Sequence, residues 1–291
     1  MSRAFEGRAD LDAMKLVLCQ GRLASPRSGY WHPGELDWWF GYIGDFASTT
    51  RVWVDEPGLA GWVVADPKNR AADMAVRPDL RGGEAEAELL RGAEDLLGPG
   101  RVSVFAWAND PLRADLLTGA GYGHEEPQFE TLVCSLTDPV DVPELPPGFR
   151  ILPVLTDDWV AERAECHHRA FDPSKMTAER YGAFRSVSGY DPELDVAIVS
   201  DDDRIVAYTM AWADTASSTA QLEPVGTRPH FWRQGLGRVA NREALRRLQE
   251  RGVRLTAVNT YAGHAGNIKF YESCGFDRVT TIDRWSKVTT G

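Results

Sequence analysis

Long apolar runs, an apolar N-terminal leader and an excess of basic side chains are all absent from this chain of 291 residues. A membrane-spanning helix needs about 20 consecutive, mostly apolar residues. No stretch is apolar over that length, so the sequence predicts no membrane association. The first ten residues, MSRAFEGRAD, mix both charges without an apolar core, which predicts no secretory signal peptide. We therefore expect a cytoplasmic protein.

Basic residues number 32 against 43 acidic ones, for a formal net charge of −11. Nucleic-acid binding draws much of its affinity from clustered lysine and arginine, so the composition argues against nucleic acid as a partner. An acidic surface attracts cationic small molecules, and it also keeps a protein in solution. The charge alone does not choose between these roles, and the sequence does not indicate an oligomeric state.

Cysteine is scarce, and its spacing carries no motif. The four cysteines lack C-x-x-C spacing, in a chain too large to need disulfides, so we expect reduced thiols in the core; they are Cys19, Cys134, Cys166 and Cys274. The neighbours His167 and His168 fall on a predicted helix, where they point about 100° apart and cannot easily hold one ion. The sequence therefore predicts no metal site.

Helix and strand signals alternate along the chain in two similar series, which predicts an α/β fold with mixed sheets. The first series has helices at 10–19, 111–119 and a stretch ending at 97, and strands at 50–54, 61–65, 72–76, 102–107 and 129–136. The second has strands at 149–152, 196–200, 205–212, 221–227 and 255–258, and helices at 157–171, 177–187 and from 236 to a stop at Gly252. Six aromatic residues between Trp31 and Phe46 are expected in the core or a cleft wall.

Prolines mark the boundary between the two series. The segment 139–148 contains four of them, and proline forbids helix and interrupts strand pairing, so we expect an extended connector. The length allows about two domains. The predicted division is a domain at 1–138, a linker at 139–148 and a domain at 149–291.

The stretch from Gln221 to Gly252 combines a strand, a glycine turn and an amphipathic helix. Pro224 has no N–H and Gly226 weakens a strand, so we expect a bulge where pairing ends and backbone groups stay free for a ligand. The first N–H groups of the following helix lack internal partners and attract anions. A lone G-x-G turn is more often plain backbone geometry, so this pattern needs further support.

Two motifs supply that support. V-G-T-R-P-H-F-W-R-Q-G-L-G spans residues 225–237, and N-I-K-F-Y-E-S-C-G-F spans 267–276. Together they resemble the GNAT acetyltransferases, whose pyrophosphate loop reads Q/R-x-x-G-x-G/A and whose following segment reads N-x-x-A-x-x-x-Y-x-x-x-G-F. The resemblance covers about residues 149–287. Trp232 departs from it, because the family usually has Gln or Arg there.

The resemblance implies two tandem GNAT-like domains, each a mixed, mostly antiparallel sheet flanked by helices. This tandem arrangement is similar to that of the mycothiol synthases, a likeness of architecture that assigns no substrate. The resemblance also implies that acetyl-CoA is the co-substrate and that no metal is needed. The implied cofactor-binding residues are Val225, Gly226, Thr227, Arg233, Gln234, Gly235, Leu236, Gly237, Arg238 and Asn267.

Acyl transfer to an amine needs a group that takes the amine's proton and one that protonates the departing thiolate. Glu223 is the candidate base, acting through water, or alternatively the group that binds the substrate ammonium; it could also be an exposed strand carboxylate. Tyr271 is the candidate acid, against a tyrosine that only packs on the sheet. His230 and His264 lie in nearby loops as alternative bases.

The first series repeats the order of the second but lacks its site residues. Aligning the two places Glu84 and Glu86 where the second half has Gly235 and Gly237, and Leu117 where it has Tyr271. Carboxylates in a helix's first turn satisfy its partial positive charge and repel a polyanion. We therefore expect a degenerate N-terminal half that supports the active half and contributes a wall of the amine site.

The leading hypothesis is an acetyl-CoA-dependent N-acetyltransferase that acts on a primary amine of a small molecule through its C-terminal half. The alternative is a non-catalytic acyl-CoA-binding or sensing module, which Trp232 and the degenerate first half keep open. The identity of the amine is not indicated by the sequence.

Overall fold

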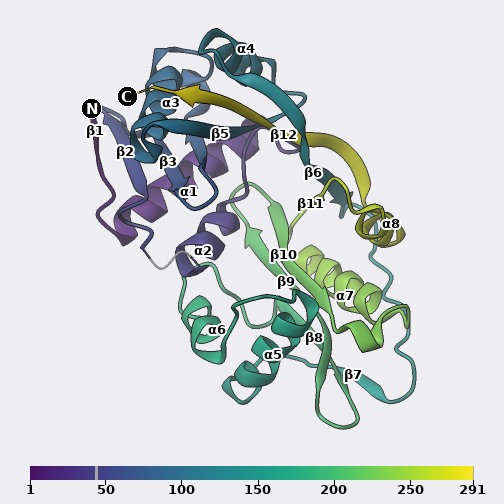
Figure 1. Ribbon diagram of the computed structural model, residues 1–291. Helices are drawn as coiled ribbons and strands as arrows, with labels where there is room; N and C mark the ends of the chain where they lie inside the picture. The colour runs from purple at the N-terminus through teal and green to yellow at the C-terminus, as the bar shows by residue number, and fades with distance from the viewer. Residues whose placement is uncertain (43–44, 291) are drawn as a thin grey trace.

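The structure is a computed structural model that describes residues 1–42 and 45–290 (Figure 1). Three predicted segments extend beyond that part of the chain. The domain 1–138 and the aromatic segment 31–46 include residues 43 and 44, and the domain 149–291 includes residue 291; these positions lie outside the described residues.

The N-terminal half contains the following elements in chain order: β1 (Ser2–Ala4), α1 (Arg8–Ala24), α2 (Pro33–Tyr42), β2 (Thr50–Asp55), β3 (Gly58–Asp66), β4 (Ala71–Val76), the 3-10 turn Pro78–Leu80, α3 (Glu84–Leu97), β5 (Gly100–Trp107), α4 (Pro111–Gly119) and β6 (Gly123–Ser135). The segment 139–148 that follows has no helix or strand, as predicted. Its backbone docks on a neighbouring helix, where Gln249 accepts a hydrogen bond from the Val140 N–H.

The C-terminal half continues with β7 (Phe149–Ile151), the 3-10 turn Asp157–Trp159, α5 (Val160–Ala170), α6 (Ala178–Phe184), β8 (Asp195–Ser200), β9 (Ile205–Asp214), β10 (Thr219–Thr227), the 3-10 turn Pro229–Phe231, α7 (Leu236–Glu250), β11 (Leu255–Tyr261), α8 (Ala265–Ser273) and β12 (Asp277–Thr289). Every predicted helix and strand is present, with ends shifted by a few residues. The elements β1, α2, α8 and β12 were not predicted.

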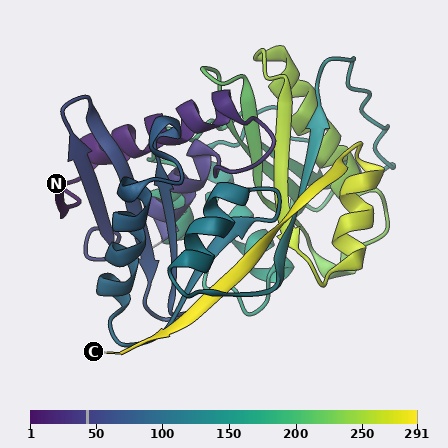
Figure 2. The same cartoon turned by 90° about the horizontal axis from the view of Figure 1, so that it is seen from above.

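The strands form one sheet in the order β1-β2-β3-β4-β5-β12-β6-β11-β10-β9-β8-β7. Only β4–β5 and β10–β11 pair in parallel, so the predicted mixed, mostly antiparallel arrangement is confirmed. The two halves exchange their last strands. β6 pairs with β11, and β12 lies between β5 and β6; Figure 2 shows the yellow β12 running from α8 into the N-terminal half. The pairing therefore crosses the predicted domain boundary, which stays a prediction.

Alternating side chains in β8 and β9 bury both faces of the C-terminal sheet, as the period of a strand requires. Val196, Ile198 and Val206 pack under α7, while Ala197, Val199 and Ile205 pack under α5 and α6. The two faces thus carry different helices, and each face is closed by apolar contacts.

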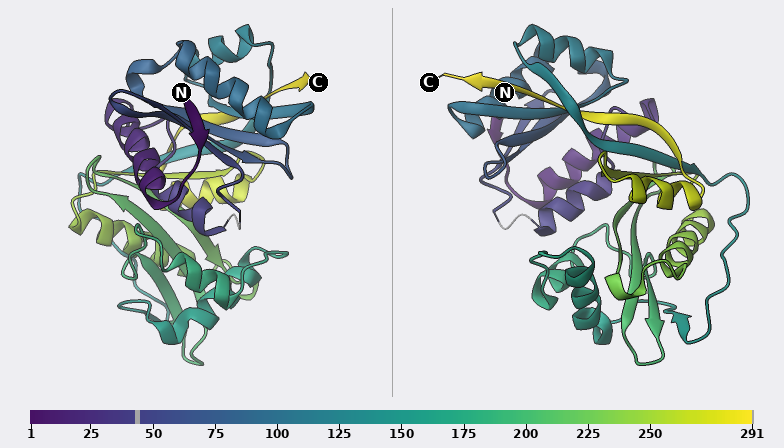
Figure 3. Two further views of the ribbon diagram at one scale, coloured as in Figure 1. Left: turned by 90° about the vertical axis from the view of Figure 1, so that its left-hand side faces the viewer. Right: turned by 45° about the vertical axis from the view of Figure 1, so that its right-hand side comes forward.

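Helix α2 belongs to the N-terminal half but packs against β9, β10 and α6 of the C-terminal half (Figure 3). Trp38 stacks on Phe184 with ring centroids 4.4 Å apart. Gly34, in the first turn of α2, lies directly against Trp212, where any side chain on residue 34 would collide with the indole. The described aromatic side chains of the segment therefore lie in the core or pack against it, and α2 joins the two halves on the face opposite α7.

Among the described residues, no helix is long and apolar enough to cross a bilayer. The four cysteines are buried and unbridged, as predicted. Adjacent His167 and His168 make separate contacts, with the Tyr208 hydroxyl and the Ser174 carbonyl. Within the described part of the chain, no three His, Cys, Asp or Glu side chains converge in a way that could hold a metal ion.

The exchanged strand β12 identifies a position where a substitution should destabilise the fold. Ile282 of β12 is fully buried, and it pairs with Trp107 of β5 and Phe129 of β6. We expect Ile282→Ala to lower the free energy of unfolding by about 2–5 kcal/mol, because it removes buried methyl groups and leaves a cavity. Denaturant titration measures this. Val288→Ala, at an exposed position of the same strand, is the control and should change stability by less than about 0.5 kcal/mol.

Candidate active site

The pairing of β10 stops part-way along its length on one side. β10 pairs with β11 only from Thr219 to Gln221, opposite Leu255 to Ala257. Its pairing with β9 continues to Thr227, with a register shift between Leu222 and Val225. The bulge predicted from Pro224 and Gly226 is therefore present. The segment 222–227, called here the free edge of β10, has no ladder partner on β11.

The turn after β10 leads into α7 with its backbone donors unused. Within the described chain, the N–H groups from Arg233 to Arg238 have no backbone acceptor. Gly235 caps α7 with a φ of 82°, a left-handed conformation that glycine adopts without strain. Arg233, Gln234 and Arg238 are exposed beside it. An array of free N–H groups at a helix N-terminus, flanked by arginines, is a ready anion site.

Two further side chains border this array. Trp232 is 59% exposed, and its indole Nε1 donates to the Thr227 carbonyl over 2.8 Å. Asn267, in the first turn of α8, donates from Nδ2 to Thr260 Oγ1 over 3.3 Å, at the far end of β11. The predicted cofactor residues thus lie along the free edge of β10, in the turn that follows it, and beside β11.

Glu223 lies in the bulge of β10. Its main-chain carbonyl accepts a hydrogen bond of 2.6 Å from Trp212 Nε1, which holds the bulge against β9. No hydrogen bond from the described residues reaches its carboxylate. Burial without a compensating partner raises the pKa of Glu223 to about 7. A carboxylate with that pKa exchanges protons at neutral pH, as a general base must.

Tyr271 is only 8% exposed, on α8, where its ring packs against Phe270 and Phe276. Burial, followed by the charges of Glu223 and Cys274, raises the pKa of Tyr271 far above its usual value. The hydroxyl therefore stays protonated, and among the described residues it makes no hydrogen bond. Because the charge of Glu223 reaches Tyr271, the fold places the two predicted catalytic residues in one neighbourhood.

The two alternative bases lie elsewhere on the surface. His230 is exposed and packs against Phe231, with ring centroids 5.5 Å apart. His264 is exposed at the N-cap of α8, 5.9 Å from the ring of Tyr261. Neither histidine shows the burial and electrostatic coupling that link Glu223 with Tyr271.

Glu35 of α2 is a residue of this region that the sequence did not indicate. It is 7% exposed, and its Oε1 accepts a hydrogen bond of 3.2 Å from Asn259 Nδ2 of β11. Burial, then the charges of Glu223 and Asp73, raise the pKa of Glu35 well above its usual value. No local motif surrounds Glu35, so only the three-dimensional contact between the halves could identify it.

The equivalent turn of the N-terminal half is filled by protein. Glu86 is fully buried in the first turn of α3, where it accepts hydrogen bonds from the Gly82 N–H over 2.5 Å and from Arg113 Nε over 2.6 Å. Arg81 lies 3.6 Å away. Burial alone would raise the pKa of Glu86, but the two guanidinium groups lower it overall. A carboxylate thus occupies the anion position.

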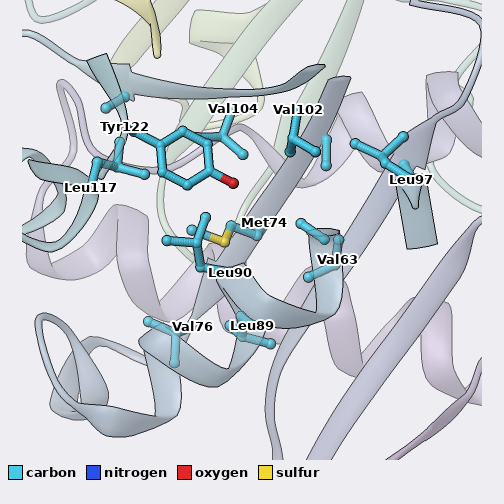
Figure 4. Close-up of a cluster of buried hydrophobic side chains, with 14 of the residues drawn as sticks. Val63, Met74, Val76, Leu89, Leu90, Leu97, Val102, Val104, Leu117 and Tyr122 are labelled. Carbon is cyan, nitrogen blue, oxygen red and sulfur yellow. The ribbon is translucent and has the colours of Figure 1, made fainter. Parts of the chain in front are cut away.

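The predicted alignment of the two turns needs one correction. The turn is one residue shorter in the N-terminal half, because Gly83 caps α3 whereas Gly235 caps α7. Glu84 is exposed and pairs with Arg91, so Glu86 alone fills the turn. Leu117 lies where predicted. Figure 4 shows it packed beside Tyr122 in the N-terminal core, and the Tyr122 N–H bonds to the Leu117 carbonyl as the Phe276 N–H bonds to that of Tyr271.

Comparison with known proteins bears on this site directly. Residues 154–276 match the model of the acetyltransferase (GNAT) family. The C-terminal half contains a GNAT domain. Two relatives named mycothiol acetyltransferase share 26% identity over 250 residues (Thermobispora bispora; 82% of this chain, 83% of the relative) and 21% over 256 residues (Paenarthrobacter aurescens; 85% and 79%). The GNAT domain and these acetyltransferase relatives together make the protein an N-acetyltransferase by class.

Solved structures support the fold over the whole chain. A tandem GNAT protein from the clavulanic acid biosynthesis pathway superposes with a TM-score of 0.67 at 16% identity, covering 100% of this chain and 99% of that one. A GCN5-related N-acetyltransferase from Sphaerobacter thermophilus gives 0.64 at 20% identity, covering 99% and 95%. At these identities the likeness concerns the fold alone, and it includes the N-terminal half that the family model does not match.

The filled turn generates a prediction about stability. We expect Glu86→Gln to lower the free energy of unfolding by about 3–5 kcal/mol, because it leaves Arg113 without its buried carboxylate partner. The native pKa of Glu86 lies below its unfolded value, so its stabilisation is present above the unfolded pKa and is lost as pH falls through the native pKa. Urea titrations at several pH values measure both effects. Glu84→Gln, at the exposed neighbour, should leave the stability unchanged.

Proposed function

We propose that this protein transfers the acetyl group of acetyl-CoA to a primary amine of a small molecule, and that the GNAT domain carries the reaction. The observation that carries this proposal is the partly buried, unpaired carboxylate of Glu223 on the free edge of β10, coupled to the protonated Tyr271. The unused N–H groups of residues 233–238 lie at the next turn of the chain.

The turn and the free edge of β10 fit the two parts of acetyl-CoA. The N–H groups from Arg233 to Arg238 would hold the diphosphate, with the arginine side chains adding charge. Val225, Gly226 and Thr227 would pair with the pantetheine arm through main-chain groups, as a strand would, and Asn267 would bind the same arm from the β11 side. No metal takes part in this scheme.

The chemistry then needs one attack and three proton transfers, two from the nitrogen and one to the sulfur. Glu223 accepts a proton from the acceptor ammonium, through water, and the neutral amine attacks the thioester carbonyl. The Val225 N–H stabilises the negative charge that develops on the carbonyl oxygen. Tyr271 donates its proton to the sulfur as the carbon–sulfur bond breaks. The attached nitrogen passes its second proton, through water, to the tyrosine oxygen, so that an amide and coenzyme A are released and Tyr271 is protonated again. At neutral pH Tyr271 holds the protonated state that its role requires, and Glu223, with a pKa of about 7, exchanges between its two states.

The same proposal covers the division of labour between the halves. The domain 1–138, the linker 139–148 and the catalytic domain 149–291 are inferred as units, with the N-terminal domain unable to bind acetyl-CoA because Glu86 fills its turn. A cytoplasmic location is part of the proposal. The relatives named mycothiol acetyltransferase support the reaction class, and their identity of 21–26% leaves the acceptor of this chain to experiment.

A non-catalytic acyl-CoA-binding or sensing module is the second candidate. Trp232 favours it, because its indole occupies the Thr227 carbonyl at the end of the free edge, where a pantetheine amide would otherwise bond. One measurement distinguishes the two functions. An acetyltransferase releases thiol from acetyl-CoA in the presence of amines, and a non-catalytic binding module does not.

The binding of acetyl-CoA tests the proposed cofactor site. Calorimetry should show one site per chain, and Gly235→Glu should weaken binding at least about tenfold, since it places a carboxylate beside the diphosphate and disturbs a left-handed cap. Gly83→Glu, at the matching cap of α3, is the control and should bind acetyl-CoA as the wild type does. Two sites per chain, or equal effects of both variants, would contradict the assignment of the C-terminal half.

Two substitutions test the catalytic pair. Tyr271→Phe should lower kcat by about 100-fold to 10,000-fold while the Kd for acetyl-CoA changes little, because only the proton donor is lost. In the wild type, kcat/KM should fall as pH drops below about 7, where Glu223 becomes protonated. Glu223→Gln should remove that acidic limb along with most of the rate. Thiol release across an amine panel measures all three, and an unchanged rate in both variants would refute the site.

A further inference from the structure

We propose that Glu35, supplied by the N-terminal half, is an acceptor-binding residue of the catalytic site and that it selects cationic primary amines without a carboxylate next to the nitrogen. This inference rests on the proposed acetyltransferase function. It assigns substrate selectivity to a residue outside the matched GNAT domain.

The position of α2 is the first reason. Gly34 lies against Trp212, and Trp212 Nε1 bonds to the Glu223 carbonyl. Glu35, which follows Gly34, therefore lies near the bulge of β10. It arrives on the face opposite α7, whose N-terminus is the proposed diphosphate site. An acceptor held there approaches the thioester from the side that the cofactor leaves open.

The bonding of Glu35 is the second reason. Its Oε1 accepts from Asn259 Nδ2, and Asn259 Oδ1 in turn accepts from Thr131 Oγ1 over 2.9 Å, so the carboxylate is held in one orientation across the end of the β10–β11 pairing. Its second oxygen accepts no hydrogen bond from the described residues. Because Glu35 keeps 7% exposure, this oxygen is accessible and free to accept from a ligand.

The charges around Glu35 give the third reason. Burial, then the charges of Glu223 of β10 and Asp73 of β4, raise the pKa of Glu35, whereas the Asn259 hydrogen bond and the charge of Arg22 of α1 lower it. Arg22 is shared with Asp214, and its Nε and Nη2 atoms are buried without a hydrogen-bond partner in the described chain. Glu35 thus lies in the field of two further carboxyl groups, which favours an arriving ammonium. A substrate carboxylate would add a further negative charge beside them.

Proton coupling follows from this arrangement. Close carboxyl groups do not ionise independently, and the pair Glu35 and Glu223 retains a proton that an arriving cation displaces. Glu35 then binds the ammonium while Glu223 is available to take its proton. Gln at position 35 keeps the shape and the hydrogen bond with Asn259 but cannot carry the charge.

Matched amine pairs test the selectivity. Each pair differs by one carboxylate beside the nitrogen: ethanolamine and serine, and tyramine and tyrosine. In every pair that is acetylated, we expect the wild type to prefer the member without the carboxylate by at least about tenfold in kcat/KM. Glu35→Gln should raise the acceptor KM about tenfold or more, change kcat less, and reduce the preference to about twofold.

Two control variants separate binding from folding. Glu35→Asp keeps the charge and should retain the preference. Asp37 lies on the same helix as Glu35 and pairs with Lys15 of α1. Asp37→Asn removes this ion pair and should lower stability without altering the preference. Equal use of carboxylated amines by the wild type, or an unchanged preference in an active Glu35→Gln enzyme, would overturn the role of Glu35 alone. Acetyl-CoA binding without acetylation of any amine would instead overturn the proposed function, and this inference with it.

Discussion

The loss of pairing between β10 and β11 beyond Gln221 is the constraint on which the site depends. A sheet that continued its ladder to Thr227 would satisfy its own backbone groups and leave nothing for a ligand to bond. The bulge at Glu223 and Pro224 prevents this. It also turns a strand carboxylate into a poorly solvated group next to α8. One irregularity thus supplies both the backbone edge and the base, while β9 keeps the strand in place on its other side.

The two halves show how one architecture carries a site or closes it. In both, a strand ends in Arg-Pro, passes a 3-10 turn and enters a helix. The C-terminal turn keeps its donors free and surrounds them with exposed arginines. In the N-terminal turn a backbone N–H donates to the Glu86 carboxylate, and Arg81 and Arg113 balance the charge of that carboxylate. The backbone path is nearly the same in both turns. They differ because a carboxylate of the protein already accepts from the N-terminal turn, whereas the donors of the C-terminal turn are free.

Much of the fold was readable from local patterns, because proline, glycine and apolar spacing act within a few residues. The bulge followed from Pro224 and Gly226, and the end of α7 from Gly252. The exchanged strand β12 was not readable. Its alternation is weak, with Asp277, Arg278 and Arg284 among its residues, and its partners lie more than 140 positions away in the sequence. Glu35 was not predicted for the same reason, because its hydrogen-bond partner Asn259 lies 224 residues further along the sequence.

The exchange of last strands has a consequence for biosynthesis. β12 follows all the other elements in the chain, yet its position in the sheet is between β5 and β6. During translation the N-terminal lobe therefore emerges with one edge of β5 waiting for a strand that the ribosome has not yet made. Sheet closure in both lobes becomes a single late event, dominated by contacts of long sequence separation, which fold slowly. Nascent chains of this protein expose an open β-edge until β12 has been made, and that interval is when they most need protection from aggregation.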